Sequence, residues 1–195
     1  FPEVQIPTTA VYEFIFGDLD DSDADRIAIT EVATGADYTY RELTTRIEAF
    51  AGALAARGLG VGDVVGLLAP NSAAFAVAFH GILRSGATAT TINALFTAKD
   101  IAKQLTDSGA AMLITVTALA PQALQAAEQI GLAPDRIVLL DGPGSAIDGH
   151  PNAAELLDAA LPAPQVSFDP ATHLAALPYS SGTTGNPKGV MLTHT

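Results

Sequence analysis

The stretch YSSGTTGNPKGV, residues 179–190, combines three glycines, four serine or threonine side chains and one lysine within twelve residues. Gly182, Gly185 and Gly189 permit tight turns and a close approach of the backbone to a ligand. The hydroxyl groups and the successive backbone N–H groups of such a turn can together bind an anion. Lys188 adds a positive charge on a flexible stem. The pattern therefore predicts a loop that binds a polyphosphate.

The spacing differs from the Walker pattern G-x-x-x-x-G-K-[ST], because Lys188 follows a proline and precedes a glycine. The stretch instead resembles the signature [ST]-[ST]-G-[ST]-[ST]-G-x-P-K-G of the adenylate-forming (ANL) superfamily, which includes acyl-CoA synthetases, 4-coumarate–CoA ligases, luciferases and peptide-synthetase adenylation domains. Every fixed position is matched, and Asn186 occupies the variable one. The following MLTH, residues 191–194, is most similar to the coumarate and fatty-acid ligase branch. A looser likeness runs through residues 38–131.

In the resembling enzymes a carboxylic acid attacks the α-phosphate of ATP, and the resulting acyl-adenylate passes its acyl group to a thiol, usually that of coenzyme A. The resemblance implies that seven residues of this chain bind the ATP phosphates: Ser180, Ser181, Gly182, Thr183, Thr184, Gly185 and Lys188. It also implies that Thr183 helps to hold Mg²⁺ and that Lys188 holds the leaving pyrophosphate. The acid would be phenylpropenoic or fatty.

The superfamily's catalytic lysine, adenine-binding motif and most of its acyl pocket follow the phosphate loop. The resemblance therefore places no catalytic residue within this chain. We expect residues 1–170 to form the N-terminal α/β subdomain of a large domain, and residues 171–195 to supply a strand and the phosphate-binding loop. The remainder of the large domain and the small C-terminal domain would belong to the full-length enzyme. The 195-residue chain alone is not expected to catalyse adenylation.

Other classes of function stay open at this point. One is a sibling enzyme, either an acyl-AMP ligase that passes its product to a carrier protein or a peptide-synthetase adenylation domain. Another is a nucleotide-binding module with no catalytic activity. The wording YSSGTTG-x-PKGVM favours the coenzyme A branch.

The composition narrows the class of partner. With 49% hydrophobic and 15% charged residues, the chain is expected to be globular. A net charge of −12, with nine lysines and arginines and no basic run, argues against nucleic acid or an anionic membrane surface. The sequence has no cysteine, so disulfides and thiolate metal sites are excluded within it. No uninterrupted apolar run reaches about 18 residues, so we expect a cytoplasmic protein without an integral membrane segment.

Apolar runs of strand length alternate with amphipathic helical patterns. The runs are residues 64–69, 87–92, 111–116 and 136–140. This alternation predicts an α/β fold, a mainly parallel sheet with helices on both faces. Such sheets bind ligands beyond the carboxyl ends of their strands. Residues 173–179 are predicted to form one strand, so the phosphate loop would leave its carboxyl end.

Helix boundaries are also indicated. Thr39 and Glu42 match a capping box, and an apolar stripe follows on the helix predicted for residues 39–58. The stripe consists of Leu43, Ile47, Phe50 and Leu54. Thr8 or Thr9 is expected to cap a short helix around residues 11–16. Residues 18–25, with five aspartates, are expected to be a solvated loop.

Four histidines are candidates for chemistry. His80 is expected to pack within a helix, and His150 to lie on the surface. His173 begins the predicted strand and is expected only to position the loop. His194 closes the motif, and no role is transferred to it from the resembling family.

Overall fold

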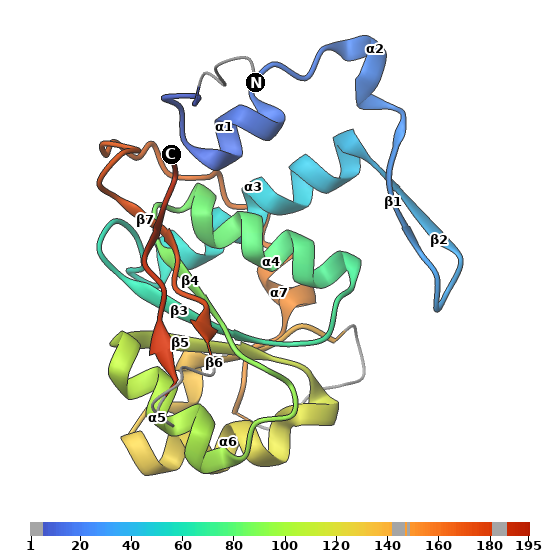
Figure 1. Ribbon diagram of the computed structural model, residues 1–195. Helices are drawn as coiled ribbons and strands as arrows, with labels where there is room; N and C mark the ends of the chain where they lie inside the picture. Colours follow the sequence, from blue (N-terminus) through green and yellow to red (C-terminus); the bar gives the residue numbers. More distant parts are fainter. Residues whose placement is uncertain (1–5, 142–146, 148, 181–186) are drawn as a thin grey trace.

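The computed structural model describes residues 6–141, 147, 149–180 and 187–195. A six-stranded sheet lies between two layers of helices (Figure 1). The helices are α1 (Val11–Phe16), α2 (Asp21–Ala24), α3 (Tyr40–Ala56), α4 (Ala73–Arg84), α5 (Ala98–Ser108), α6 (Ala120–Ile130) and α7 (Ala153–Asp158). The strands are β1 (Ile27–Glu31), β2 (Ala36–Thr39), β3 (Val64–Leu68), β4 (Thr88–Thr91), β5 (Ala110–Thr115), β6 (Ile137–Leu139), β7 (Leu174–Ala176), β8 (Tyr179–Ser180), β9 (Lys188–Gly189) and β10 (Leu192–Thr193).

The strand order in the sheet is β10-β7-β4-β3-β5-β6. Neighbours from β7 to β6 pair in parallel, and β10 runs antiparallel to β7 at one edge. The four apolar runs of the sequence form β3, β4, β5 and β6, as predicted. The central strand β3 is covered on both sides, and Leu67 and Leu68, whose side chains face opposite ways, are both completely buried. This two-sided burial explains why the runs are continuously apolar and do not alternate.

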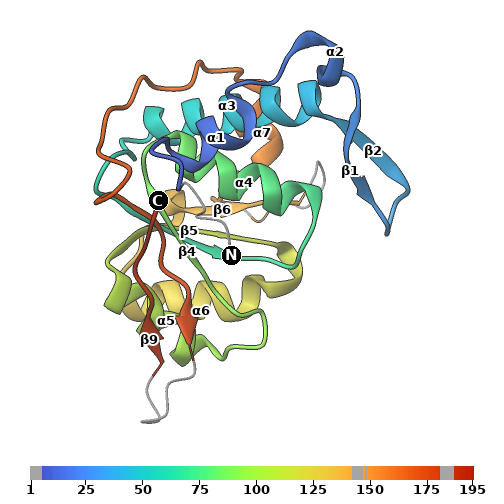
Figure 2. The same cartoon turned by 45° about the horizontal axis from the view of Figure 1, so that its top comes forward.

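Helices cover both faces of the sheet. α3, α4 and α7 lie over one face and α5 and α6 over the other, which Figure 2 shows from a second angle. Adjacent residues of β5 divide between the two cores, because Met112 packs with the α3 side and Leu113 with the α5 side. The predicted fold class, a mainly parallel α/β sheet, is confirmed. Within the described part of the chain, no helix is both long and apolar enough to cross a membrane.

The capping box at α3 forms as predicted. The Thr39 hydroxyl oxygen accepts a hydrogen bond from the Glu42 backbone N–H, and the Glu42 carboxylate accepts one from the Thr39 N–H. The whole apolar stripe of α3 is buried: Leu43, Ile47, Phe50 and Leu54. A second box, made by Thr97 and Asp100, begins α5. These exchanges satisfy N–H groups that the first helical turn leaves without partners.

The expected cap of α1 is wrong. Its N-cap is Ala10, and neither Thr8 nor Thr9 makes a capping hydrogen bond. Instead, the Val11 N–H donates to Nδ1 of His194, 3.1 Å away and 183 residues further along the chain. A tertiary contact therefore satisfies the Val11 N–H, which the side chain of Thr8 or Thr9 was expected to bind.

The acidic segment at residues 18–25 is not loop throughout, which corrects a second expectation. Asp20 begins the short helix α2, and its carboxylate accepts hydrogen bonds from the N–H groups of Ser22 and Asp23. Aspartate is among the best N-cap residues, because its negative charge also complements the positive end of the helix.

The connection from α7 to β7 crosses over α3 at Gly52. A Cβ atom on Gly52 would overlap the carbonyl oxygen of Leu161, so only glycine permits this approach. Beyond the crossing, the Arg84 guanidinium donates to the Pro164 carbonyl at 2.8 Å and pairs with the Glu48 carboxylate at 2.9 Å. These contacts fix the path by which the chain returns to the sheet as β7.

Candidate functional site

The described ends of the phosphate-loop stretch form a short antiparallel ribbon. β8 pairs with β9, which places Ser180 opposite Lys188 and Tyr179 opposite Gly189. Ser180 and Lys188 are both exposed. Figure 2 shows the ribbon leaving the sheet and running past α5. Of the seven predicted phosphate ligands, Ser181, Gly182, Thr183, Thr184 and Gly185 lie outside the described residues, so the structure places only the first and the last.

The single strand predicted for residues 173–179 is two shorter strands, β7 and β8. Pro178 separates them, and a proline has no N–H with which to continue a strand ladder. The break is still held to the sheet, because the Leu177 N–H donates to the Ala89 carbonyl at 2.9 Å. The Thr90 hydroxyl donates to the Leu177 carbonyl at 2.8 Å. The phosphate-loop stretch therefore starts beside the carboxyl end of β4.

Tyr179 joins the ribbon to α5. Its hydroxyl donates a hydrogen bond to the Asp107 carboxylate at 2.5 Å. Its ring also lies against Gly189, where an added Cβ atom would come within 3.2 Å of the ring. Burial raises the pKa of the Tyr179 hydroxyl, and the hydrogen bond to Asp107 adds to the effect. The phenol stays protonated as a donor, and one side chain braces both strands of the ribbon.

A cavity of about 450 Å³ opens between the ribbon and α5. Its lining comes from α5, the segment before α5, and the ribbon with the residue that precedes β9, namely Phe96, Lys99, Asp100, Lys103, Gln104, Asp107, Tyr179 and Pro187. A second hollow of about 430 Å³ shares Gln104 and Tyr179 and adds Thr91, Asn93 and Ser180. The two hollows flank the ribbon at the carboxyl end of β4, where ligands of parallel sheets bind.

Gln104 is the buried polar group of this site. Only 3% of the residue is exposed. Its amide nitrogen donates to the Thr90 hydroxyl at 2.9 Å and to the Thr91 carbonyl at 3.0 Å. Its amide oxygen is buried and has no hydrogen-bond partner among the described atoms. An unsatisfied buried acceptor costs about 1–3 kcal/mol, so this oxygen is suited to a donor brought by a ligand or a water molecule.

Sequence reasoning missed the face of α5 that lines the cavity. Asp100, Lys103, Gln104 and Asp107 recur at spacings of three, one and three, so they share one side of the helix. The sequence alone indicates that these polar residues share one side of a helix. It does not indicate that the β8–β9 ribbon lies across the cavity from them. The Thr97 capping contacts, with Lys99 and Lys103 as smaller contributions, lower the pKa of Asp100. The stripe therefore carries both signs of charge at neutral pH.

The histidines lie apart from this cavity. His80 packs edge-on against Phe16 and Phe79, as expected, and burial lowers its pKa. His150 is partly buried, and its Nδ1 lies 2.9 Å from the Pro134 carbonyl oxygen. Among the residues that the structure describes, no cluster of three histidine or acidic side chains could hold a metal ion. Thr183, the predicted Mg²⁺ contact, is outside that set.

The chain is an α/β protein with a mainly parallel sheet, and its glycine- and hydroxyl-rich stretch begins at the carboxyl end of the strands. A family model described as AMP-binding enzyme matches residues 20–195. The chain therefore belongs to the AMP-binding enzyme family, and it corresponds to the N-terminal portion of an adenylate-forming ligase. The resemblance inferred from the sequence is confirmed.

Several of the known proteins that are similar to this chain are CoA ligases. The chain is 38% identical over 194 residues to 4-coumarate–CoA ligase 5 of Oryza sativa subsp. japonica, covering 99% of this chain and 34% of the relative. A benzoate CoA ligase from Burkholderia xenovorans LB400 superposes with a TM-score of 0.80 at 30% identity, over 95% of this chain and 35% of that protein. The anthranilate CoA ligase AuaEII, solved in complex with anthranoyl-AMP, shares the fold with a TM-score of 0.84 at 24% identity, over 97% of this chain and 36% of that protein. The chain thus spans about a third of the length of the relatives it matches.

Proposed function

We propose that the full-length protein is an ATP-dependent acid–thiol ligase. A carboxylic acid would attack the α-phosphate of ATP, forming an acyl-adenylate and releasing pyrophosphate. The thiol of coenzyme A would then take the acyl group and release AMP. The observation that carries the proposal is the ribbon, in which Ser180 and Lys188 stand opposite each other at the two ends of the signature stretch. Family membership and the CoA-ligase relatives support it.

The chain's own contribution would be to hold the triphosphate during the in-line displacement. We propose that Ser180, Ser181, Gly182, Thr183, Thr184 and Gly185 bind phosphate oxygens through hydroxyl and backbone N–H groups. Lys188 would bind the leaving pyrophosphate, and its exposed position leaves the ammonium accessible to a ligand. Charge-assisted contacts of this kind contribute about 1.5–3 kcal/mol each. Mg²⁺, for which Thr183 would supply one ligand, would neutralise phosphate charge when bound.

We also propose the division of the full-length protein. Residues 1–170 would be the N-terminal α/β subdomain, and residues 171–195 would add the strand and phosphate-binding loop. The remainder of the large domain and a small C-terminal domain, which would carry the catalytic lysine, would complete the enzyme. We also propose that the full-length protein is cytoplasmic, which cell fractionation would test.

For the acid we propose a phenylpropenoic or fatty acid. Two similar proteins, a 4-coumarate–CoA ligase and a benzoate CoA ligase, favour an aromatic carboxylate. An acyl-AMP ligase or a peptide-synthetase adenylation domain is the alternative. Transfer of the acyl group to a carrier protein, with none to coenzyme A, would favour the alternative. Absence of any acid-dependent pyrophosphate release would leave a non-catalytic nucleotide-binding module.

The test separates the two half-reactions in the full-length protein. Lys188→Ala and Thr184→Ala should lower acid-dependent pyrophosphate release from ATP by on the order of 10²–10³, because each removes a donor to developing charge. Lys188→Arg should restore part of the rate, since it keeps the charge but changes the geometry. Thr34→Ala, at the tip of the β1–β2 hairpin, is the matched control and should leave the rate unchanged.

Thioester formation from premade acyl-adenylate has no triphosphate to hold, so these variants should affect it far less. Equal losses in both half-reactions would mean that the loop supports the fold or a domain movement. The assignment of Lys188 and Thr184 as phosphate ligands would then be withdrawn.

A further inference from the structure

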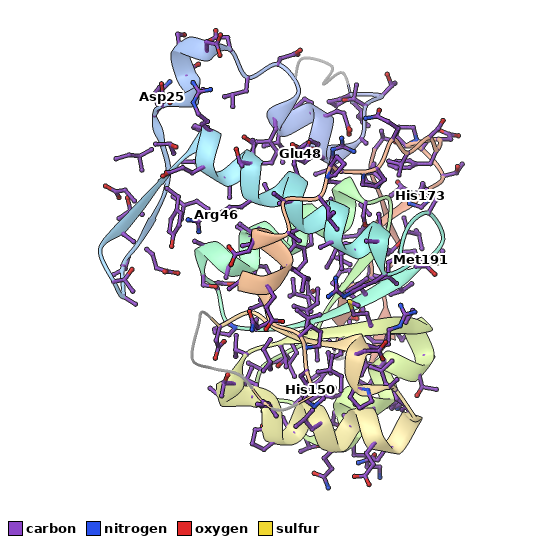
Figure 3. All side chains as sticks on the ribbon, turned by 180° about the vertical axis from the view of Figure 1, so that it is seen from behind. Asp25, Arg46, Glu48, His150, His173 and Met191 are labelled. Atoms are coloured by element: carbon purple, nitrogen blue, oxygen red, sulfur yellow. The ribbon has the colours of Figure 1, made fainter. Side chains whose placement is uncertain are left out.

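Three aromatic rings lie against one another at the base of the strand pair β7 and β10, which carries the phosphate-loop stretch. β10 pairs with β7 in a register that sets Thr193 opposite Leu174, so His194 and His173 stand side by side at its end. Their rings are nearly parallel, with centroids 5.6 Å apart and an interplanar angle of 10°. Phe168 packs against both, at 4.2 Å from the His173 ring and 4.9 Å from the His194 ring. Figure 3 shows His173 at this end of the sheet, with Met191 in the segment between β9 and β10.

Each histidine is hydrogen-bonded to a different part of the fold. Nε2 of His173 lies 2.8 Å from the Gly86 carbonyl, directly after α4, and therefore carries the proton. Nδ1 of His194 accepts the Val11 N–H at the first turn of α1. This N–H is one of the donors that a helix cannot satisfy internally, and no local side chain caps α1. The base of the strand pair is thus attached to both α4 and α1.

The contact to α1 requires one chemical form of His194. Because Nδ1 accepts a hydrogen bond, the proton of the neutral ring must lie on Nε2. That Nε2 is buried and has no hydrogen-bond partner among the described atoms, so a charged imidazolium would be poorly solvated. Burial, and secondarily the neighbouring His173, lower the pKa of His194 to about 4. The titratable groups on the segments packed around the ring are His173 and Asp169, together with Tyr12 and Glu13 on α1.

The same strands lead from His194 to the candidate site. Six residues separate Lys188 from His194, which is roughly 20 Å of extended chain. Paired strands hold both ends of that path, β9 against β8 and β10 against β7. Between them, the Val190 N–H donates to the Pro178 carbonyl at 2.8 Å. A displacement at the base is therefore transmitted toward Lys188 and is not absorbed by a free loop.

We propose that His194 is a positioning residue for the phosphate-binding site. Its neutral imidazole fastens the base of the strand pair to α1, and through β10 and β9 it sets the place of Lys188. The inference rests on the proposed function of Lys188, and it adds a residue that lines neither hollow and contacts neither Ser180 nor Lys188.

The first test uses the 195-residue chain and needs no catalytic activity. In ¹⁵N-resolved NMR of the imidazoles, His194 should be the Nε2–H tautomer at neutral pH, and an Nδ1–H tautomer would overturn the proposal. His194→Asn keeps an amide oxygen close to the position of Nδ1, whereas His194→Gln places it one bond further out. Amide exchange should stay slow at Val11 and Val190 in His194→Asn and become about tenfold faster at both in His194→Gln.

A second variant removes the donor and leaves His194 in place. Val11→Pro lacks the N–H, and proline is well accepted at the first position of a helix after an extended residue such as Ala10. Val11→Pro should accelerate exchange at Val190 as His194→Gln does. In Val11→Pro the hydrogen bond between residue 11 and His194 is lost. If amide exchange at Val190 nevertheless stays slow, the contact at α1 is not coupled to the β8–β9 ribbon.

The second test uses the full-length protein. His194→Gln and Val11→Pro should raise the ATP KM of pyrophosphate release about tenfold and leave thioester formation from premade adenylate unchanged. His194→Asn should stay within about twofold of wild type, as should the control His150→Asn. Equal effects of His194→Gln and His194→Asn, or equal loss in both half-reactions, would reduce His194 to a purely structural residue. If the wild-type protein forms no acyl-adenylate, the proposed function fails, and the exchange experiment alone decides the positioning role.

Discussion

The hydroxyl of Tyr179 and the carboxylate of Asp107 are joined by a 2.5 Å hydrogen bond, although 72 residues separate them in the chain. Tyr179→Phe should therefore lower the free energy of unfolding by about 0.5–1.5 kcal/mol, because it removes one hydrogen bond while the ring still packs on Gly189. Urea titration of the chain measures the change. Tyr38→Phe is the control. It also removes a tyrosine hydroxyl, but it keeps the ring on which the Arg46 guanidinium packs. A Tyr179→Phe variant as stable as wild type would show that the ribbon is not braced by α5.

The crossing at Gly52 should tolerate no side chain. Gly52→Ala places a methyl group into the Leu161 carbonyl oxygen, and backbone on both sides must move. We expect a loss of about 1–3 kcal/mol or more, as for other overpacked sites. Gly60→Ala is the matched control, because its added Cβ would meet only the Ser85 carbonyl oxygen at an ordinary 3.6 Å. Similar unfolding midpoints for the two variants would contradict the close crossing.

The buried stripe of α3 should be sensitive to truncation. Leu54 is completely buried, so Leu54→Ala should cost about 2–5 kcal/mol through lost burial and the cavity left behind. Val61, which is 51% exposed, supplies the control, and Val61→Ala should change stability by less than about 0.5 kcal/mol. Denaturant titration of both variants is the measurement. If Leu54→Ala lowers the free energy of unfolding by less than 1 kcal/mol, α3 is packed more loosely than in this structure.

Stability should fall as the pH is lowered from about 6.5 to about 4. His194 has a pKa of about 4 in the folded chain and an ordinary value of 6.5 when unfolded, so the unfolded chain takes up the proton first. Its contribution is complete above pH 6.5 and is lost as the pH falls toward 4. Exposure of part of the ring reduces the size of the effect.

Urea midpoints measured between pH 4 and 8 test this pH dependence. His194→Asn should flatten the curve, although a residual slope should remain because burial also lowers the pKa of His80. An unchanged slope in His194→Asn would assign the whole pH dependence to other groups.

Local patterns were sufficient to predict most of the framework. The apolar runs that became β3 to β6, and the Thr39–Glu42 box that begins α3, depend on residues close together in sequence. The family could be read from residues 179–190 alone, because a glycine and hydroxyl pattern of that length is specific. Fold class and family therefore needed no tertiary information.

Several of the predictions that were wrong or incomplete depended on tertiary contacts, and others missed a local signal. The cap of α1 could not be predicted, since its acceptor, His194, lies 183 residues away. The strand expected for residues 173–179 is divided by Pro178, a signal that the sequence did contain. Gln104 and Asp107 were polar positions on a predicted helix, and only the return of the chain beside α5 makes them part of a cavity. The inner residues of the phosphate-loop stretch stay a prediction.

The hydrogen bond between Val11 and His194 has a consequence for the order of events during synthesis. Helix α1 is synthesised before the acceptor for its first N–H, which is translated 183 residues later. At about 5–20 residues per second, α1 would wait roughly 10–40 s for that partner. Phe14 and Ile15 on its surface remain 64% and 47% exposed even after docking, so the nascent chain presents apolar groups throughout this interval.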